Sequence, residues 1–493
     1  MVFSNTVKLN YIKGEEAMKR KQLIRFAMSV VLVGGILAGC GGTKETSVSE
    51  TKDQTGTVTE STDASKAGDD GKVHITYAQW GNDTETAATQ AVADKFNAEQ
   101  DKIFVEVLKI DHDNYVTKLN AMATAGELPD TGIMSEAGVL DFAENGLLYD
   151  ISDMYGENDA KPLKSLTFTF KGTPVAYSAA NEVLNMWYNI DLLKEVCEKQ
   201  GLNPADFTPP ASVNDAWDWD TFVKIAQTLT LDINGKNALD PDFDPQNIEI
   251  YGCNINTLAW QLEVWALSNG AGYYNEDGTK CTINAAETAE ALQAIADLTL
   301  KYHCAPEISD ASNSLNTSLG TEKVVMSTDG AWNVGTFLGP DANFEYGVGV
   351  LPYFKNKVTI CTGGPNVVFE QTKHPEEAMT WLKWYYQEEN SWSLIEAGTW
   401  MPILESWYTE QELTDKWINN ENFPEHDMYQ AAVVDYARDN SKSTAWYYVN
   451  GTEEFNSTLT MVLSYIWNGD MTAQEALDEY YDELNEIYEE YNK

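Results

Sequence analysis

Tryptophans and carboxylates at the ends of predicted strands are the residues best placed for chemistry in this sequence. The candidates after strands are Trp80, Asp83, Glu136, Asp329 and Trp332, and Trp260 is a further aromatic candidate. An indole face packs against apolar C–H groups, whereas a carboxylate accepts hydrogen bonds from hydroxyls or pairs with a cation. Together these groups predict a binding site for a small polar molecule.

The spacing of histidine and cysteine argues against a metal centre. The histidines are scattered without an HExxH pattern, at His74, His112, His303, His374 and His426. Beyond residue 40 the cysteines are Cys197, Cys253, Cys281, Cys304 and Cys361, with no CxxC pair. Zinc ligands usually come in such close pairs, so we expect no zinc site and no cofactor. Outside the cell two of these thiols can form a disulfide, but the wide spacing does not say which.

One acidic segment has the alternation of a calcium loop without its remaining ligands. Carboxylates alternate in Asp240-Pro-Asp-Phe-Asp-Pro245. A calcium loop also needs glycine at its sixth position and a closing glutamate at its twelfth, where Tyr251 stands. We therefore expect no calcium site there.

The charge balance restricts the partners of the chain. It has 77 acidic and 32 basic residues, a formal charge of −45. Such a field repels nucleic acid, so none is expected as a partner. Beyond residue 39 the only arginine is Arg438. Because arginine is the usual residue for capturing carboxylates and phosphates, the ligand is expected to be neutral or cationic.

Strands and helices alternate in the part that must position the first candidates. Strands are predicted at 73–80, 103–110 and 131–135, and helices at 84–99 and 114–125. This order predicts a parallel sheet in an α/β fold, in which ligands lie beyond the carboxyl ends of the strands. Trp80, Asp83 and Glu136 follow such ends.

The rest of the chain mixes helices and strands and then becomes helical. Helices are predicted at 216–229 and 287–302, and strands at 280–283 and 324–327. Near the carboxyl end, Thr472 and Glu475 have the spacing of a capping box. An apolar stripe follows it and predicts core packing, at Leu477, Tyr480, Tyr481, Leu484, Ile487, Tyr488 and Tyr491.

The amino end has the pattern of an export signal. Basic residues between 19 and 25 precede an apolar run at 26–36, which is too short to span a membrane. Leu37-Ala-Gly-Cys40 follows and resembles the bacterial lipobox, in which the cysteine receives a diacylglycerol and becomes the new amino terminus. We expect 1–39 to be the signal region, with translation starting at Met18. Residues 40–72, rich in Ser, Thr, Asp, Glu, Lys and Gly, are expected to be a disordered tether from lipidated Cys40.

From about residue 75 onwards the chain resembles extracellular solute-binding proteins of family 1, the sugar-capturing subunits of bacterial ABC importers that include maltose-binding protein. Among the motifs are Leu128-Pro-Asp130, Glu144-Asn-Gly-Leu-Leu148 and Trp187-Tyr-Asn-Ile-Asp-Leu-Leu193. Later motifs are Lys323-Val-Val-Met-Ser-Thr-Asp-Gly-Ala-Trp332, Tyr346-Gly-Val-Gly-Val-Leu-Pro352 and Gly363-Gly364.

The resemblance implies a two-lobed α/β periplasmic-binding-protein fold of type II, with a hinge between lobes that close on the ligand. The amino-terminal lobe would comprise about 72–177 and 360–386, and the carboxyl-terminal lobe about 178–351 and 387–493. The expected protein is a monomer without enzymatic activity. A lipid would hold it at the outer face of the cytoplasmic membrane of a Gram-positive cell, where it would deliver a carbohydrate to the permease subunits.

The resemblance also gives roles to candidate residues. Trp332 matches the position where the family stacks a sugar ring, and Trp400 lies in a loop that the family often turns into the cleft. Gly363 and Gly364 would let the backbone approach the ligand, and Trp187 lies near the first lobe crossing. Maltose-type members have a glutamate near that crossing. Pro174-Val-Ala-Tyr-Ser178 has no acid there, which argues against maltose as the ligand.

Two other functions stay open at this point. An aromatic site with carboxylates also binds cations, so the same fold could take a polyamine. A pair of carboxylates at a suitable separation would be enough for an exported glycoside hydrolase, although the family pattern speaks against it.

Overall fold

The computed structural model describes residues 70–81, 83–111, 115–156, 159, 161–163, 166–308, 314–338, 342–398, 400–420 and 423–492. The predicted signal region, Cys40 and most of the predicted tether lie outside these residues. All described residues belong to one compact unit of the chain, Asp63–Lys493. Among them, no helix is long and apolar enough to cross a bilayer.

The first of two sheets is built from the amino-terminal part and one returning strand. Its order is β2-β1-β3-β12-β5-β4. The strands are β1 (Val73–Gln79), β2 (Ile103–Lys109), β3 (Thr131–Ile133), β4 (Thr167–Phe170), β5 (Thr173–Ser178) and β12 (Pro365–Val368). β1 pairs in parallel with β2 and β3, as the alternation of strands and helices predicted, and β12 runs antiparallel to β3 and β5.

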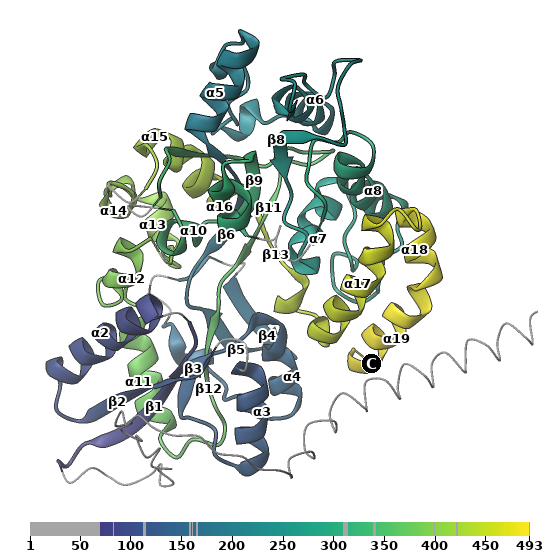
Figure 1. Cartoon of the computed structure of the whole chain (residues 1–493). Coiled ribbons are helices and arrows are strands. Elements are labelled where there is room, and N and C mark those ends of the chain that lie inside the picture. Colours follow the sequence, from purple (N-terminus) through teal and green to yellow (C-terminus); the bar gives the residue numbers. More distant parts are fainter. Residues whose placement is uncertain are drawn as a thin grey trace, which may run out of the picture. The chain divides into compact units, whose positions relative to one another are not determined.

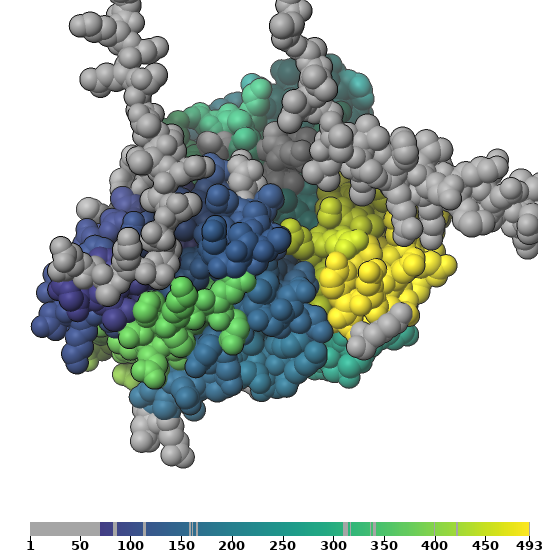
Figure 2. Space-filling model, turned by 90° about the horizontal axis from the view of Figure 1, so that it is seen from below, coloured from purple at the N-terminus to yellow at the C-terminus, as the bar shows by residue number. Residues whose placement is uncertain are grey.

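Helices cover both faces of this first sheet (Figure 1). They are α2 (Asp83–Glu99), α3 (Tyr115–Ala125), α4 (Val139–Glu144) and α11 (Pro375–Tyr385). α2 packs on β2, and α11 on β1 and β12. In Figure 2, the green returning segment with α11 lies among blue and purple amino-terminal residues, so distant stretches of sequence form one structural layer.

The second sheet has the order β13-β11-β6-β9-β8-β7, and β10 pairs with β6. Its strands are β6 (Glu182–Asn189), β7 (Leu231–Asp232), β8 (Ile248–Asn254), β9 (Val324–Gly330), β10 (Tyr346–Gly349), β11 (Thr359–Thr362) and β13 (Ser441–Ser443). β6 and β9 are buried along their whole length, because layers cover both faces of this sheet.

Helices also surround the second sheet. The larger ones are α5 (Ile190–Gln200), α6 (Trp219–Leu229), α7 (Ala259–Ser268), α8 (Ala286–Leu300), α17 (Thr452–Trp467) and α19 (Tyr481–Tyr491). The shorter ones are α9 (Leu315–Ser318), α10 (Asn333–Thr336), α12 (Trp392–Glu396), α13 (Ser406–Thr409), α14 (Gln411–Ile418), α15 (His426–Tyr429), α16 (Tyr436–Asn440) and α18 (Ala473–Glu479). Single turns include η2 (Glu136–Gly138), η11 (Ala445–Tyr447) and the π-helical η10 (Gln430–Asp435).

Two connections between the sheets pass each other at 179–181 and 363–364. The Ala179 amide donates to the Gly364 carbonyl over 2.8 Å. A Cβ on Gly363 would lie 2.0 Å from the Ala180 carbonyl oxygen, so only glycine fits there. The need for glycine at 363 therefore comes from the crossing of the chain with itself.

The predicted elements near the carboxyl end are mostly present. Thr472 and Glu475 form the predicted capping box of α18. In the stripe that follows, Leu477, Leu484 and Tyr488 are buried, which confirms core packing for these three.

The predicted strand at 280–283 is wrong. After the tight turn that precedes Lys280, only a single bridge forms, between Tyr274 and Cys281.

The structure gives no disulfide and no metal cluster in its described part. The five cysteines there are buried free thiols. No group of three or more His, Cys, Asp or Glu side chains in the described ranges could hold a metal ion. In the acidic segment, backbone amides donate to the carboxylates of Asp240 and Asp244, so these side chains stabilise the turns of their own loop.

Candidate ligand-binding site

Three tryptophans from separate segments form a row in the second-sheet region, and we call it the indole row. Trp260 lies in the first turn of α7, Trp332 follows β9, and Trp446 lies in η11. The ring centroids of Trp260 lie 6.2 Å from Trp332 and 5.0 Å from Trp446. Trp260 and Trp332 are half-buried, whereas Trp446 is 7% exposed. The row therefore offers two partly open aromatic faces backed by a buried third ring.

The end of β9 explains how Trp332 is held. The ring of Trp332 folds over Gly330, where a Cβ would lie 1.8 Å from the indole Cζ3 atom. The Ala331 amide donates to the Val183 carbonyl and continues the contact between β9 and β6. Glycine before the tryptophan is therefore a packing requirement, and it lets the ring lie flat against its own backbone.

The buried side chain of Asp329 stabilises the turn between β9 and Trp332 by hydrogen bonds. Its carboxylate accepts the Gly330 amide over 2.8 Å and the Gln261 side-chain amide over 3.5 Å. The side chain is 4% exposed, and burial raises the pKa of Asp329 to about 6. Gln261 directly follows Trp260 in α7. Asp329 therefore links the two segments that carry the half-buried Trp260 and Trp332. A positioning role fits this geometry better than a direct contact with a ligand.

A second buried carboxylate lies one turn along α7 from Trp260. Glu263 is 4% exposed and accepts the Ala445 amide over 3.2 Å, which ties α7 to the segment that carries Trp446. Burial raises the pKa of Glu263 to about 7. Trp260, Glu263 and Trp446 together line a small cavity. The Glu263 carboxylate can therefore accept a hydrogen bond from a ligand group that enters this cavity.

The first-sheet side contributes Glu136, at the start of η2 directly after β3. Thr362, the last residue of β11 in the second sheet, donates its hydroxyl to Glu136 over 3.0 Å. Tyr447, next to Trp446, exchanges a 2.8 Å hydrogen bond with Ser178. Burial raises the pKa of Tyr447, and the nearby Cys361 and Glu136 raise it further. Glu136 therefore lies close to Tyr447, the residue after Trp446, and its role in binding stays a prediction.

A family model described as "bacterial extracellular solute-binding protein" matches residues 91–425. The chain belongs to this family. The match ends before Trp446, so the third indole of this solute-binding protein lies outside the matched residues.

Solved structures agree on the fold. An ABC substrate-binding protein from Listeria monocytogenes in complex with cycloalternan is 21% identical, with a TM-score of 0.68 over 84% of this chain and 98% of that one. A cyclic alpha-maltosyl-1,6-maltose binding protein from Arthrobacter globiformis is also 21% identical, with a TM-score of 0.68 over 85% and 100%.

A maltose/maltodextrin-binding domain from Bdellovibrio bacteriovorus bound to maltotriose is 15% identical, with a TM-score of 0.64 over 85% and 99%. At these identities the likeness shows the fold. The solute-binding protein has the two-lobed α/β periplasmic-binding-protein fold that the sequence predicted.

Trp80, the first-strand tryptophan of the solute-binding protein, follows β1 on the same edge as Glu136. Its ring meets Tyr115 edge-on, with centroids 5.0 Å apart, and lies against Gly364, whose Cβ would be 2.8 Å from it. Trp80 is half-buried, so one part of the indole stays accessible. The side chain of Asp83 lies outside the description, and its predicted role is untested.

Three predicted site residues have other surroundings. Trp187 is fully buried in β6 and donates its indole N–H to the Asp329 carbonyl over 3.1 Å, which places it in the core. It faces no open space, so we leave it out of the site. Gly363 and Gly364 pack against Ala180 and Trp80 of their own chain, so the close backbone approach that we assigned to a ligand serves the fold.

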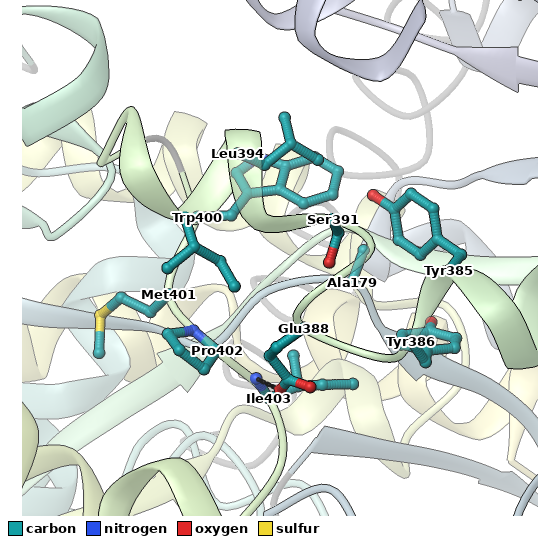
Figure 3. Close-up of a pocket in the computed structure, with 11 residues that line it drawn as sticks. Ala179, Tyr385, Tyr386, Glu388, Ser391, Leu394, Trp400, Met401, Pro402 and Ile403 are labelled. Carbon is teal, nitrogen blue, oxygen red and sulfur yellow. Dashed lines mark hydrogen bonds between the residues drawn. The ribbon is translucent and has the colours of Figure 1, made fainter. Parts of the chain in front are cut away.

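Trp400 lies in a different cavity from that of the indole row. Figure 3 shows it beside Leu394 and Ser391, with Tyr385, Tyr386 and Glu388 on the other walls. Glu388 accepts the Ile403 and Leu404 amides over 3.1 and 2.9 Å, and burial raises the pKa of Glu388 to about 7. No residue lines both cavities, so Trp400 lies apart from the indole row and its predicted role in binding stays a prediction.

Sequence reasoning missed Trp446 and Glu263. Trp446 comes from a short turn after the edge strand β13, so no periodic pattern marks it. Glu263 is one of 77 acidic residues, most of which are solvated, and it lies in a helix that reads as apolar core. The available signal was the i, i+3 spacing from Trp260, which places both residues on one face of α7.

Proposed function

We propose that this solute-binding protein captures a neutral carbohydrate and delivers it to an ABC importer. The observation that carries the proposal is the indole row, with Trp260 and Trp332 half-open and carboxylates close by. A sugar ring presents an apolar C–H face and a rim of hydroxyls, which match flat aromatic faces and hydrogen-bonding carboxylates.

The distribution of positive charge supports a ligand without anionic groups. Arg438 forms ion pairs with Asp435 and Asp439 over 3.1 and 2.6 Å, and it donates to the Tyr408 carbonyl. The guanidinium of Arg438 therefore already has hydrogen-bond partners within the protein. The solved structures of similar fold include proteins with cycloalternan, maltotriose and α-D-tagatose bound, which also supports a carbohydrate.

The proposal includes closure of two lobes around the sugar, the first at about 72–177 and 360–386, the second at about 178–351 and 387–493. The first sheet collects strands from 73–178 and 365–368, and the second collects strands from 182–362 together with 441–443. Strand β11 pairs within the second sheet, which favours a returning crossing at 363–364, a few residues after the proposed bound at about 360. The paired crossings at Ala179 and Gly364 are suited to act as the hinge.

The proposed cellular arrangement follows the amino-terminal pattern. The protein would be a monomer, held by lipidated Cys40 at the outer face of a Gram-positive cytoplasmic membrane. Residues 40–72 would form the tether that lets the lobes reach the permease. No chemical step is assigned to the protein, because capture and release are enough for this role.

A thermal-shift screen of the purified chain tests the proposal. A ligand at about 100 times its Kd stabilises the folded state by roughly 2.7 kcal/mol, so binding sugars should raise the Tm. We expect a mono- or oligosaccharide to do so and to be recovered unchanged. Stabilisation by spermidine alone would favour the polyamine alternative, and turnover of a glycan would favour the hydrolase.

A further inference from the structure

The cavity behind the indole row has unpaired polar groups that no part of the protein satisfies. It has a volume of about 10 Å³ and is lined by Trp260, Glu263, Thr444, Trp446 and Thr452, among others. Three of its side-chain atoms are buried without a hydrogen-bond partner, the Trp446 Nε1 and the Thr444 and Thr452 hydroxyls. Buried polar groups are normally paired, so the three atoms around this cavity need a partner that the described part of the protein does not supply.

The size of the cavity limits what can enter it. A volume of roughly 10–15 Å³ holds about one water-sized group. A whole sugar ring or a polyamine chain is far larger, so only a small substituent of a ligand can fill it. Trp260 belongs to both this cavity and the indole row, which places the substituent next to the aromatic face on which a ring would lie.

The donors and acceptors select the chemistry of that substituent. The indole N–H of Trp446 can only donate, whereas the Glu263 carboxylate accepts. A hydroxyl accepts from the indole and donates to the carboxylate at the same time. An ammonium group has no lone pair for the indole N–H, and a carboxylate would lie against Glu263, which is 4% exposed.

We propose that this cavity receives the hydroxyl of the exocyclic hydroxymethyl group of a hexose whose ring lies against the indole row. The inference rests on the proposed carbohydrate function and names a subclass of ligand. Sugars with a C6 hydroxyl fill the cavity and pair its polar atoms. Pentoses and 6-deoxy sugars leave those atoms unpaired, and uronates bring a second acidic group against buried Glu263, where burial disfavours ionising both.

Isothermal titration of the purified chain with matched sugars tests the inference. The probes are glucose, xylose, 6-deoxyglucose and glucuronate, together with cellobiose and xylobiose, which differ only in their hydroxymethyl groups. Buried donors left unpaired weaken binding substantially, so we expect the hexose series to bind roughly 10- to 100-fold more tightly than its partners. Equal affinity for the two series would overturn the inference and leave the carbohydrate function standing.

Conservative variants of cavity residues test whether the preference for hexoses over pentoses depends on this cavity. Glu263→Gln keeps an acceptor for the Ala445 amide, Thr444→Val keeps the shape, and Trp446→Phe keeps an aromatic ring without the N–H. Each should reduce the ratio of hexose to pentose affinity toward one. If one variant fails to fold, the other two carry the test. An unchanged ratio in every folded variant would refute the assignment.

Two matched controls separate the cavity from general effects of buried polar groups. Glu388→Gln changes a buried carboxylate that also accepts backbone amides, and Thr89→Val removes a buried hydroxyl that also has no partner. Neither residue lines this cavity. Both controls should keep the full affinity ratio, and loss of the ratio in either would contradict the inference. If no sugar of any kind binds, the proposed function falls together with it.

Discussion

The buried carboxylate of Glu263 should make the protein less stable as the pH rises, and Glu263→Gln should remove that loss. Burial raises the pKa of this group from an ordinary value of 4.5 to about 7. The folded protein therefore holds the proton more tightly than the unfolded chain does. The resulting stability is complete below about pH 4.5 and is lost as the pH rises through about 7.

The size of the effect follows from the two pKa values. A tenfold change in proton affinity is worth about 1.4 kcal/mol, so the rise from 4.5 to about 7 corresponds to about 3 kcal/mol. The side chain is 4% exposed, so solvent screening reduces this figure little. A folded part of roughly 420 residues has an unfolding entropy of about 0.9 kcal/mol per kelvin, so 3 kcal/mol shifts the Tm by about 3 °C.

Unfolding measured by circular dichroism at pH 4.5 and pH 8 gives the test. Between these values the Tm of Glu263→Gln should rise by about 3 °C relative to that of the unchanged protein. Glu388→Gln, at a carboxylate with the same raised pKa in a separate cavity, should give a similar and additive effect. Identical pH dependence in the unchanged protein and in Glu263→Gln would refute the reasoning.

Three further predictions concern the ligand, the crossing and the anchor. Trp332→Ala should abolish carbohydrate binding in a titration while the Tm changes by only a few degrees; the half-buried Trp392→Ala is the control, and retained affinity in Trp332→Ala would remove Trp332 from the site. Gly363→Ala places a methyl group 2.0 Å from a backbone oxygen and should cost about 1–3 kcal/mol or more in urea unfolding, so unchanged stability would contradict the tight crossing. Cys40→Ala should move the protein from the membrane fraction to the medium, and labelled palmitate should no longer be incorporated; continued membrane association would argue against the anchor.

The fold could be predicted from the sequence because its signals are local and repeated. Strands and helices alternate from Val73 to the third strand, and the capping box at Thr472 marks a helix start by its own hydrogen bonds. The predicted strand at 280–283 is wrong because a short alternating run after a turn gives the same pattern whether one of its residues or all four pair with another strand.

The site was harder to predict, since contacts between distant segments decide it. Strand-end position selected Trp332, which lies beside Trp260, whereas the resemblance selected Trp187, whose indole is satisfied inside the core. Trp446 contacts Trp260 from almost 200 residues further along the sequence, and no local pattern encodes that contact.

Three glutamates are buried in the described residues, and two of them, Glu263 and Glu388, differ in what their carboxylates satisfy. Each loses about 3 kcal/mol of stability at neutral pH relative to acid pH, on the same arithmetic. Glu388 accepts the backbone amides of Ile403 and Leu404, which lie outside regular helices and strands. Without this carboxylate both amides would be unpaired in the interior, so its structural role accounts for the cost of burying it. Glu263 accepts one amide over 3.2 Å and lies beside a cavity with three unpaired donors. Glu263 differs from Glu182 and Glu388 in that it lines the cavity with three unpaired polar atoms, where the proposed hydroxyl would supply the partner that these atoms lack.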